Sequence, residues 1–505
     1  MSATPRDPRL ARDPRSVEPG WLSTRDVAGA SALNLGALLV QGILFLVLTP
    51  LTYRALGPAK FGGWTLMVAV QATAAVGTFG VGPALVKLVA QQRANIDSEA
   101  RIAATIGVAA RVLLGAGVAL GTLLWFLREP LARTIGRSDL GPSFAAGIGA
   151  IAIGLPALTV GLGIRSVLSG FFLNRAAIGV DILQSALTGT GAVVLGRLGA
   201  SLASLGCWLA LTHLICAAGA LAFTPAQLRR SWWHAGWKEN AAISLWDYAR
   251  WAGLANVASA AFGSVDKLVV SAVLGPVAAG VYSIGTSIVD RLTQLTAPFS
   301  RVLVPFASSR LAAGERASVA PLFELACRWV ACVLAAAGVV LLVWGDSLLG
   351  QWISPSFASE AGAMLRVLVI VYALFSAAAP GYQMALGFGE VKLLAALGVV
   401  GSVLSLVTIA LGASRYGLVG AAFGNLPYLA VLGAPARVAR FVGLAPWRVL
   451  AIDLGLPFIV LFPAAMLTRE GLTARAWLTA ALLGACVLFA LQRGRRAAAM
   501  TILSG

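Results

Sequence analysis

Runs of about twenty mostly apolar residues recur along almost the whole chain and constrain its fold more than any other feature. Six runs precede a polar interruption, at residues 29–49, 63–86, 102–127, 144–164, 177–196 and 201–223. Eight follow it, at residues 248–273, 278–303, 322–345, 361–386, 393–413, 417–436, 449–467 and 474–491. Since a helix of about twenty residues crosses the hydrocarbon core of a bilayer, the runs predict an all-α polytopic membrane protein with about fourteen transmembrane helices.

Composition supports a membrane environment and excludes several classes of protein. Of the 505 residues, 59% are hydrophobic and 11% are charged, whereas soluble domains contain about 45–50% apolar and about 25% charged residues. The five cysteines lie in apolar runs without metal-site spacing, and the two histidines are His213 and His234. The sequence therefore predicts no metal site, no histidine-based catalytic triad and no cofactor.

Positive charges lie in the short connections between apolar runs, although the formal net charge is +18. Charges scattered in this way set membrane topology and do not form a nucleic-acid-binding patch, so no nucleic-acid partner is expected. The N-terminal tail, the even-numbered connections and the C-terminal tail hold 25 of the 38 basic residues, whereas the odd-numbered connections hold 9. Because cytoplasmic loops are enriched in basic residues, both termini are predicted to be cytoplasmic.

Five segments are predicted along the chain. Residues 1–27, with five arginines among several prolines, are expected to form a disordered basic cytoplasmic tail. Residues 28–224 and 247–440 each form a six-helix bundle. Residues 225–246, which are rich in tryptophan, form a cytoplasmic linker at head-group level. Residues 441–505 hold two additional helices and a basic cytoplasmic tail.

Two parts of the chain share short patterns at a nearly constant offset. Residues 56–64 read LGPAKFGGW and residues 274–282 read LGPVAAGVY, an offset of 218. Two further pairs recur at offsets of 218 and 217, residues 197–199 with 415–417 and residues 170–175 with 387–392. Both members of each pair lie on the same predicted side of the membrane, which indicates parallel repeats related by an axis along the membrane normal. The seam between two such bundles is where alternating-access transporters bind their substrate.

Longer stretches around these turns carry a resemblance to a known family. Residues 53–91 read YRALGPAKFGGWTLMVAVQATAAVGTFGVGPALVKLVAQ, and residues 266–285 read DKLVVSAVLGPVAAGVYSIG. Later loops read PFASSRLAAGE from 305, PGYQMALGFGEVK from 380 and RYGLVGAAFGNL from 415. In this order, the set resembles the polysaccharide transporters, the bacterial O-antigen and exopolysaccharide flippases, of the multidrug/oligosaccharidyl-lipid/polysaccharide (MOP) exporter superfamily.

The resemblance implies a MOP-like fold of two six-helix bundles around a V-shaped central cavity, with two C-terminal helices outside this core. It implies a multi-pass protein of the bacterial cytoplasmic (inner) membrane that is not an enzyme. The implied activity is alternating-access transfer of an undecaprenyl-pyrophosphate-linked oligosaccharide from the cytoplasmic to the periplasmic leaflet. The implied partners are this lipid-linked oligosaccharide, membrane lipid, an H⁺ or Na⁺ coupling ion and other membrane proteins of polysaccharide assembly.

Candidate site residues are the charged residues inside the predicted helices, because intramembrane charges usually face a bundle interior. The candidates for binding an anionic pyrophosphate are Arg111, Lys267, Arg291 and Arg366. Asp266 and Asp290 lie at the depths of Arg291 and Lys267 in one predicted hairpin, so ion pairing or a role in coupling is the alternative for these residues. Near predicted helix ends, where side chains are expected to be solvated, lie Arg54, Arg165, Asp181, Arg301 and Asp453.

Two other functions compete with lipid-linked sugar transport. An H⁺- or Na⁺-coupled multidrug or toxin exporter is expected to carry acidic residues in its cavity helices, and the first helix has no carboxylate after Asp26. A membrane-embedded glycan polymerase or ligase is expected to present a long external loop, and the largest external connection, residues 128–143, is short. Net positive helices favour an anionic substrate.

Overall fold

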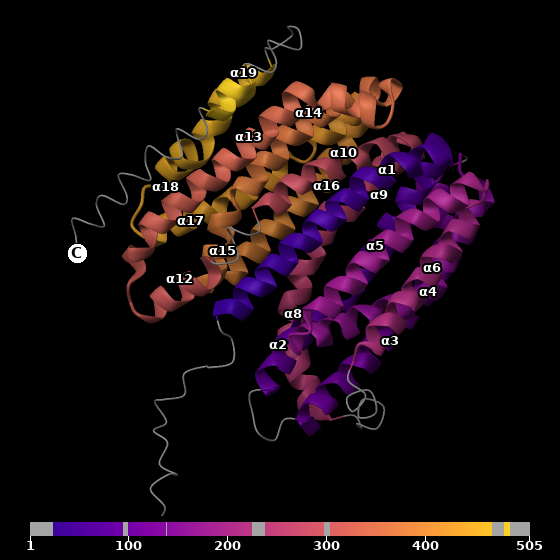
Figure 1. The fold of residues 1–505 in the computed structure, drawn as a ribbon, viewed down its shortest axis with the longest axis horizontal. Coiled ribbons are helices and arrows are strands. Elements are labelled where there is room, and N and C mark those ends of the chain that lie inside the picture. Colours follow the sequence, from indigo (N-terminus) through magenta and orange to yellow (C-terminus); the bar gives the residue numbers. More distant parts are fainter. Residues whose placement is uncertain are drawn as a thin grey trace, which may run out of the picture.

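The computed structural model describes residues 24–93, 99–137, 139–224, 238–296, 303–466 and 479–484. Within these ranges every regular element is a helix and no strand occurs. The predicted all-α fold is therefore confirmed. Figure 1 shows long helices packed side by side, with the early part of the chain in indigo and magenta on one side and the later part in orange on the other.

The helices divide along the chain into a first half, a second half and a C-terminal extension. The first half comprises α1 (Thr24–Ala75), η2 (Val76–Thr78), α2 (Val81–Arg93), α3 (Glu99–Ile135), α4 (Gly141–Gly170), α5 (Asn174–Arg197) and α6 (Leu202–Ala222). The second half comprises α8 (Glu239–Ala260), η3 (Ala261–Val265), α9 (Asp266–Leu274), α10 (Pro276–Leu295), α12 (Leu303–Ala312), η4 (Arg316–Val319), α13 (Ala320–Trp352), α14 (Pro355–Ala377), α15 (Ala379–Gly387), α16 (Val391–Phe423), η5 (Leu426–Leu432) and α17 (Gly433–Phe441). The extension comprises α18 (Pro446–Arg448), η6 (Val449–Gly455) and α19 (Leu456–Met466), and both η3 and η6 are π-helical.

Eight helical segments are long and apolar enough to cross a membrane. Two of them, Gly36–Thr78 and Val391–Phe441, contain a residue with non-helical dihedral angles, Gly57 and Gly417. The molecule is therefore a multi-pass membrane protein. In the described part of the chain the first thirteen predicted spans fall on helical segments, whereas residues 297–302 of the eighth span and all but residues 479–484 of the fourteenth, at 474–491, lie outside that part.

The repeated sequence patterns have repeated backbone conformations. Gly57 and Gly275, in the two Leu-Gly-Pro turns, have φ of 72° and 96°. Gly199 and Gly417, also 218 residues apart, have φ of 71° and 61°. These are left-handed values that glycine adopts without steric strain. The same turn chemistry thus ends corresponding helices in both halves.

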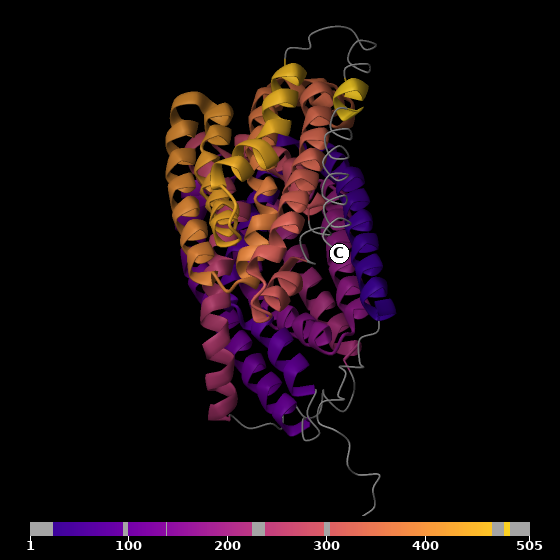
Figure 2. The same ribbon diagram turned by 90° about the vertical axis from the view of Figure 1, so that its left-hand side faces the viewer.

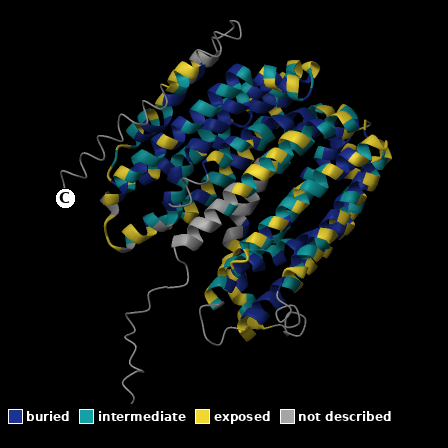
Figure 3. Ribbon diagram, viewed as in Figure 1, coloured by how far each residue is buried: buried dark blue, intermediate teal, exposed yellow. Residues whose placement is uncertain are grey.

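Small residues allow the helices of the first half to approach closely. A Cβ atom added to Gly206 of α6 would meet the backbone of Gly147 in α4, and one added to Gly121 of α3 would meet the carbonyl of Ala152 in α4. In lipid, such close approach supplies packing energy that the hydrophobic effect cannot supply between helices. Figure 3 shows many exposed positions on the outer helices of the first half. On α3 the exposed residues include the large apolar side chains Phe126 and Leu123, as a lipid-facing surface requires.

Helix α8 begins at Glu239, inside the segment predicted as a linker, whose residues 225–237 lie outside the described part. Its residues Leu245 and Ala249 are buried in a hydrophobic cluster with α2, α3 and α4 of the first half. Glu239 in the first turn favours initiation of α8, because a negative charge is stabilising at a helix N-terminus. The apolar contacts stabilise the rest of the helix. The predicted tail, residues 1–27, lies outside the described part except for its last four residues, which begin α1.

The C-terminal extension packs on the outside of α13 (Figures 1 and 2). Arg328 of α13 donates from Nε to Oδ1 of Asp453 in η6 at 2.6 Å, and both residues are buried. Glu324 of α13 forms ion pairs with two arginines. Its Oε2 lies 3.0 Å from Nη2 of Arg328, and its Oε1 lies 3.4 Å from Nη2 of Arg448. The expectation that Asp453 is solvated is wrong, because this network lies between two packed helices.

Candidate functional site

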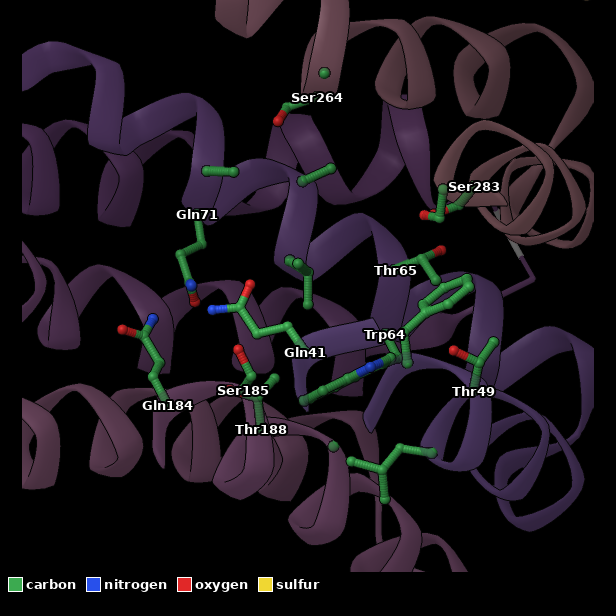
Figure 4. A pocket seen from close by; sticks show the side chains of 18 of the residues that line it. Gln41, Thr49, Trp64, Thr65, Gln71, Gln184, Ser185, Thr188, Ser264 and Ser283 are labelled. Carbon is green, nitrogen blue, oxygen red and sulfur yellow. The ribbon is translucent and has the colours of Figure 1, made fainter. Parts of the chain in front are cut away.

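A cavity of about 730 Å³ lies on the seam between the two halves. Its walls are formed by α1, α4 and α5 on one side and by η3, α9 and α10 on the other (Figure 4). Because the chain repeat relates the two halves, this is the seam that the sequence pattern predicted as the substrate site.

Lys267 lies at the junction of η3 and α9 and lines the cavity. Its Nζ donates to the carbonyl of Gly263 in the π-helical turn and lies 3.8 Å from Oδ1 of Asp266. Asp266 itself is fully buried, and its Oδ1 also accepts from the backbone N–H of Lys267 at 2.9 Å. The ammonium group is therefore shared between one carbonyl and one carboxylate.

Arg291 of α10 lines the same cavity. Its Nη1 donates to Oε1 of Gln294 at 3.0 Å, and its guanidinium lies 4.9 Å from the centroid of the Phe45 ring in α1. Among the described residues no carboxylate lies within ion-pair distance of Arg291, although its chain neighbour Asp290 contributes an electrostatic interaction. The guanidinium therefore has an amide and an aromatic ring as its direct contacts.

Arg165 of α4 is the third cation of the cavity wall. Its Nη1 contacts Oδ1 of Asp181 at 2.5 Å and Oε1 of Gln184 at 2.8 Å, both from α5. Asp181 is the one acidic residue among the lining residues, which include Arg165, Lys267 and Arg291 as bases. The lining therefore carries a formal excess of two positive charges.

Neutral polar side chains cover much of the remaining wall. The amides of Gln41, Gln71 and Gln184 gather on one side of the pocket (Figure 4). Hydroxyl groups and one indole add to the polar set, namely Thr49, Thr52, Thr65, Ser185, Thr188, Ser264, Ser283, Ser287 and Trp64. Amides and hydroxyls both donate and accept hydrogen bonds, so this part of the wall can bind a neutral polar group.

The predicted site residues are divided between the cavity and other locations. Lys267 and Arg291 line the cavity, whereas Arg111 and Arg366 do not. Arg111 is exposed on α3, and Arg366 forms an ion pair with Asp346 at 3.4 Å.

The predicted cross-pairing of Asp266 with Arg291 and of Lys267 with Asp290 is not formed. Asp266 instead contacts its neighbour Lys267. Asp290 is exposed and accepts from Nε2 of Gln294 at 3.5 Å. In this hairpin the residues at similar depth lie on different helix faces, so depth alone did not identify partners.

Three residues expected near solvated helix ends are Arg54, Arg165 and Asp181, of which Arg54 is exposed in the structure. Arg165 and Asp181 line the cavity. Arg54 donates from Nη2 to the carbonyls of Trp352 and Ile353 at 3.3 and 3.2 Å. The signal that could have found Arg165 and Asp181 is their pairing between two consecutive helices. Arg301 lies outside the described residues.

The two halves contact one another at one end of the seam, which we call the closed end. Its contacts come from residues at or near the α1 bend at Gly57, the α3–α4 turn, the α9–α10 turn and the α13–α14 turn. Gly62 of α1 packs against the carbonyl of Pro276, and Gly280 packs against Gly62, its own repeat mate. Ser271 of α9 donates to the carbonyl of Ile135 in α3 at 2.6 Å.

Comparison with known proteins supports this architecture. The family model described as "Polysaccharide biosynthesis protein" matches residues 51–358. No curated protein matches the sequence significantly.

Solved structures with the same arrangement of helices are transporters of the MOP superfamily. The chain is similar to a multidrug resistance MATE family transporter in an inward-facing conformation, with 13% identity, 81% of this chain and 98% of that chain covered, and a TM-score of 0.66. It is similar to the lipid II flippase MurJ in an inward closed conformation, with 10% identity, 91% and 98% coverage, and a TM-score of 0.66. It is also similar to a MATE protein in the straight conformation, with 14% identity, 83% and 96% coverage, and a TM-score of 0.55. The expected MOP-like fold is confirmed.

Proposed function

The chain belongs to the polysaccharide biosynthesis protein family whose model matches residues 51–358, and from this premise we propose that it is a flippase for a lipid-linked oligosaccharide. The substrate is an undecaprenyl-pyrophosphate-linked glycan, which moves from the cytoplasmic to the periplasmic leaflet of the bacterial inner membrane. The lipid tail remains in the bilayer while the head group crosses inside the protein.

The observation that carries this proposal is the chemistry of the seam cavity. Its wall has a formal excess of two positive charges, and among the described residues no carboxylate lies within ion-pair distance of Arg291. Arginine binds phosphate oxygens in a bidentate manner, and lysine binds them as a point charge. The amides and hydroxyls beside these cations suit the glycan. A pyrophosphate bearing sugars matches both parts of the wall.

Transport would follow from movement of the two halves about the seam. The connections at the closed end belong to the odd-numbered set, which is poor in basic residues and is proposed to face the periplasm. The head group would enter from the cytoplasmic side, where both termini are proposed to lie. Release would require the closed-end contacts to separate.

The lining of the seam cavity is less suited to multidrug export than to transport of an anionic head group. A cavity for organic cations needs carboxylates that remain available. The single acidic residue among the lining residues, Asp181, is held by Arg165 at 2.5 Å. The identity of the glycan and the coupling ion, H⁺ or Na⁺, form no part of the proposal.

The proposal is tested with Lys267→Gln and Arg291→Gln variants, reconstituted in liposomes with a fluorescent undecaprenyl-pyrophosphate-linked oligosaccharide. Loss of one charge-assisted hydrogen bond, worth about 1.5–3 kcal/mol, lowers affinity by about 10- to 100-fold. We expect each variant to lose transport at limiting substrate. Smaller losses are expected for Arg111→Gln and Arg366→Gln, which lie outside this cavity.

The matched control is Arg437→Gln, which removes an exposed arginine that pairs with Glu390 away from the cavity. This control should transport at the wild-type rate. Wild-type transport by both cavity variants, or faster transport of a cationic drug than of the lipid-linked glycan, would contradict the proposal.

A further inference from the structure

A continuous set of contacts joins the cavity cation Arg291 to the closed end of the seam. The guanidinium of Arg291 lies 4.9 Å from the centroid of the Phe45 ring. Phe45 also packs against Trp352, whose ring centroid lies 5.5 Å away at an interplanar angle of 53°. Phe45 belongs to α1 and Trp352 ends α13, so this stack crosses from the first half to the second.

Trp352 also satisfies a backbone group that proline leaves without a donor. In an α-helix, the carbonyl of residue 46 would accept from the N–H of residue 50, but Pro50 has none. The indole Nε1 of Trp352 donates to the carbonyl of Leu46 at 2.6 Å. A side chain from the second half therefore replaces a missing hydrogen bond inside a helix of the first half.

Arg54 makes the reciprocal contact. Its Nη2 donates to the carbonyls of Trp352 and Ile353 at 3.3 and 3.2 Å. These carbonyls lie at the C-terminal end of α13, where helical donors are absent and the helix dipole favours a positive charge. The bonds of Trp352 and Arg54 together form a latch, which exists only while α1 and the end of α13 are in contact.

We propose that Phe45 is a positioning residue through which head-group binding at Arg291 releases this latch. The inference rests on the proposed function, since it needs an anionic group at Arg291. A cation is attracted to the face of an aromatic ring by the ring quadrupole. A phosphate that binds and draws away the guanidinium removes this attraction, which frees the Phe45 ring and withdraws support from Trp352.

The consequence is that the substrate itself favours opening of the closed end. A ligand shifts a conformational equilibrium only through its different affinity for the two states. Arg291 contacts Phe45 in the latched state and phosphate in the released state, which provides this difference. When no head group is bound, the latch stays formed and the closed end of the cavity stays shut. The cavity is then not open to both sides of the membrane at once.

The test measures the distance across the closed end in nanodiscs. Spin labels are placed at cysteines replacing Arg133 and Ser359, which are exposed near this end in the first and second halves, after the native cysteines have been replaced. Inorganic pyrophosphate at saturating concentration is the probe, and its binding is measured separately. We expect pyrophosphate to shift the wild-type distances to longer values.

Four variants separate the parts of the latch. Phe45→Leu removes the ring that supports Trp352, so it should show longer distances before pyrophosphate is added and no further shift when pyrophosphate binds. Phe45→Tyr, which keeps the ring, should restore the wild-type response. Trp352→Phe should show longer distances without pyrophosphate, because the Leu46 carbonyl loses its donor. In the Pro50→Ala background the helix supplies an N–H to this carbonyl, so Trp352→Phe should add a smaller shift there.

The outcomes distinguish this inference from the proposed function. If pyrophosphate fails to bind the wild-type protein, the anionic-head-group cavity is wrong and the inference falls with it. If pyrophosphate binds but the wild-type distances stay unchanged, or if Phe45→Leu shifts as the wild type does, the proposed function stands and the latch mechanism is overturned.

Discussion

Arg328 and Arg291 are two charged residues within helices whose surroundings differ. Arg328 is buried between Asp453 and Glu324, and both of its contacts are carboxylates. Arg291 faces the cavity with an amide and an aromatic ring as its neighbours. A fully paired cation contributes to the integrity of the packed helices, whereas a cation without an acid keeps its charge for a ligand. The two arginines should therefore respond differently to substitution.

We expect Arg328→Met to destabilise the protein more than it affects substrate recognition. Removal of one partner from a buried ion pair leaves an uncompensated charge and costs about 3–5 kcal/mol. Here the remaining charge is Asp453, which is fully buried. Thermal unfolding in detergent, followed by the loss of monodisperse protein, measures the effect.

Arg448→Met is the control, because Arg448 contacts the same glutamate at 3.4 Å but its side chain is 43% exposed. Exposed pairs contribute about 0–1 kcal/mol, so this variant should melt close to the wild type. Equal melting temperatures for the two variants would show that the Arg328–Asp453 pair does not hold the extension against α13.

At the scale of elements, the glycines of the repeat have two separate tasks. Gly57 and Gly275 have positive φ and turn the chain between consecutive helices. Gly62 and Gly280 lie in helices and instead allow the two halves to touch. The sequence pattern showed all four positions, but only the packing shows that the second pair meets across the seam.

Gly62→Ala should weaken the closed end without weakening α1. Alanine has a higher helix propensity than glycine by about 1 kcal/mol, but its Cβ would overlap the carbonyl of Pro276. We expect longer distances between spin labels at positions 133 and 359, with thermal stability close to that of the wild type.

Gly219→Ala provides the comparison, because a Cβ on this α6 glycine meets nothing within 4 Å. It should leave the distances unchanged. Short distances in Gly62→Ala would mean that the seam adapts by a small shift of α10 and that the glycine contact is not required.

For the whole molecule, the sequence predicted the arrangement better than the site. Helical spans and the repeat follow from apolar runs and glycine turns, which are local properties. Two of the four candidate cations, Lys267 and Arg291, line the cavity. Arg165 was missed because α4 continues to Gly170, beyond the predicted end at 164, so this residue lies within the helix. The position of Arg111 could not be predicted because α3 is apolar on most faces, and a lipid-facing surface looks like a core-facing one.

Alternating movement of the two halves leads to the last prediction. Cysteines replacing Ala59 of α1 and Val277 of α10, both exposed at the closed end, would be joined by a cleavable flexible bismaleimide in a background without native cysteines. The cross-link should hold the closed end shut, so that transport of the fluorescent lipid-linked oligosaccharide stops and returns on cleavage. Joining Ala59 to Ser201 instead connects two positions within the first half, where Lys60 already donates to the carbonyl of Ala200 at 3.1 Å, and should leave transport intact. The link prevents α1 and α10 from separating at the closed end. Continued transport with the Ala59–Val277 link in place would therefore mean that the head group crosses without separation of the two halves.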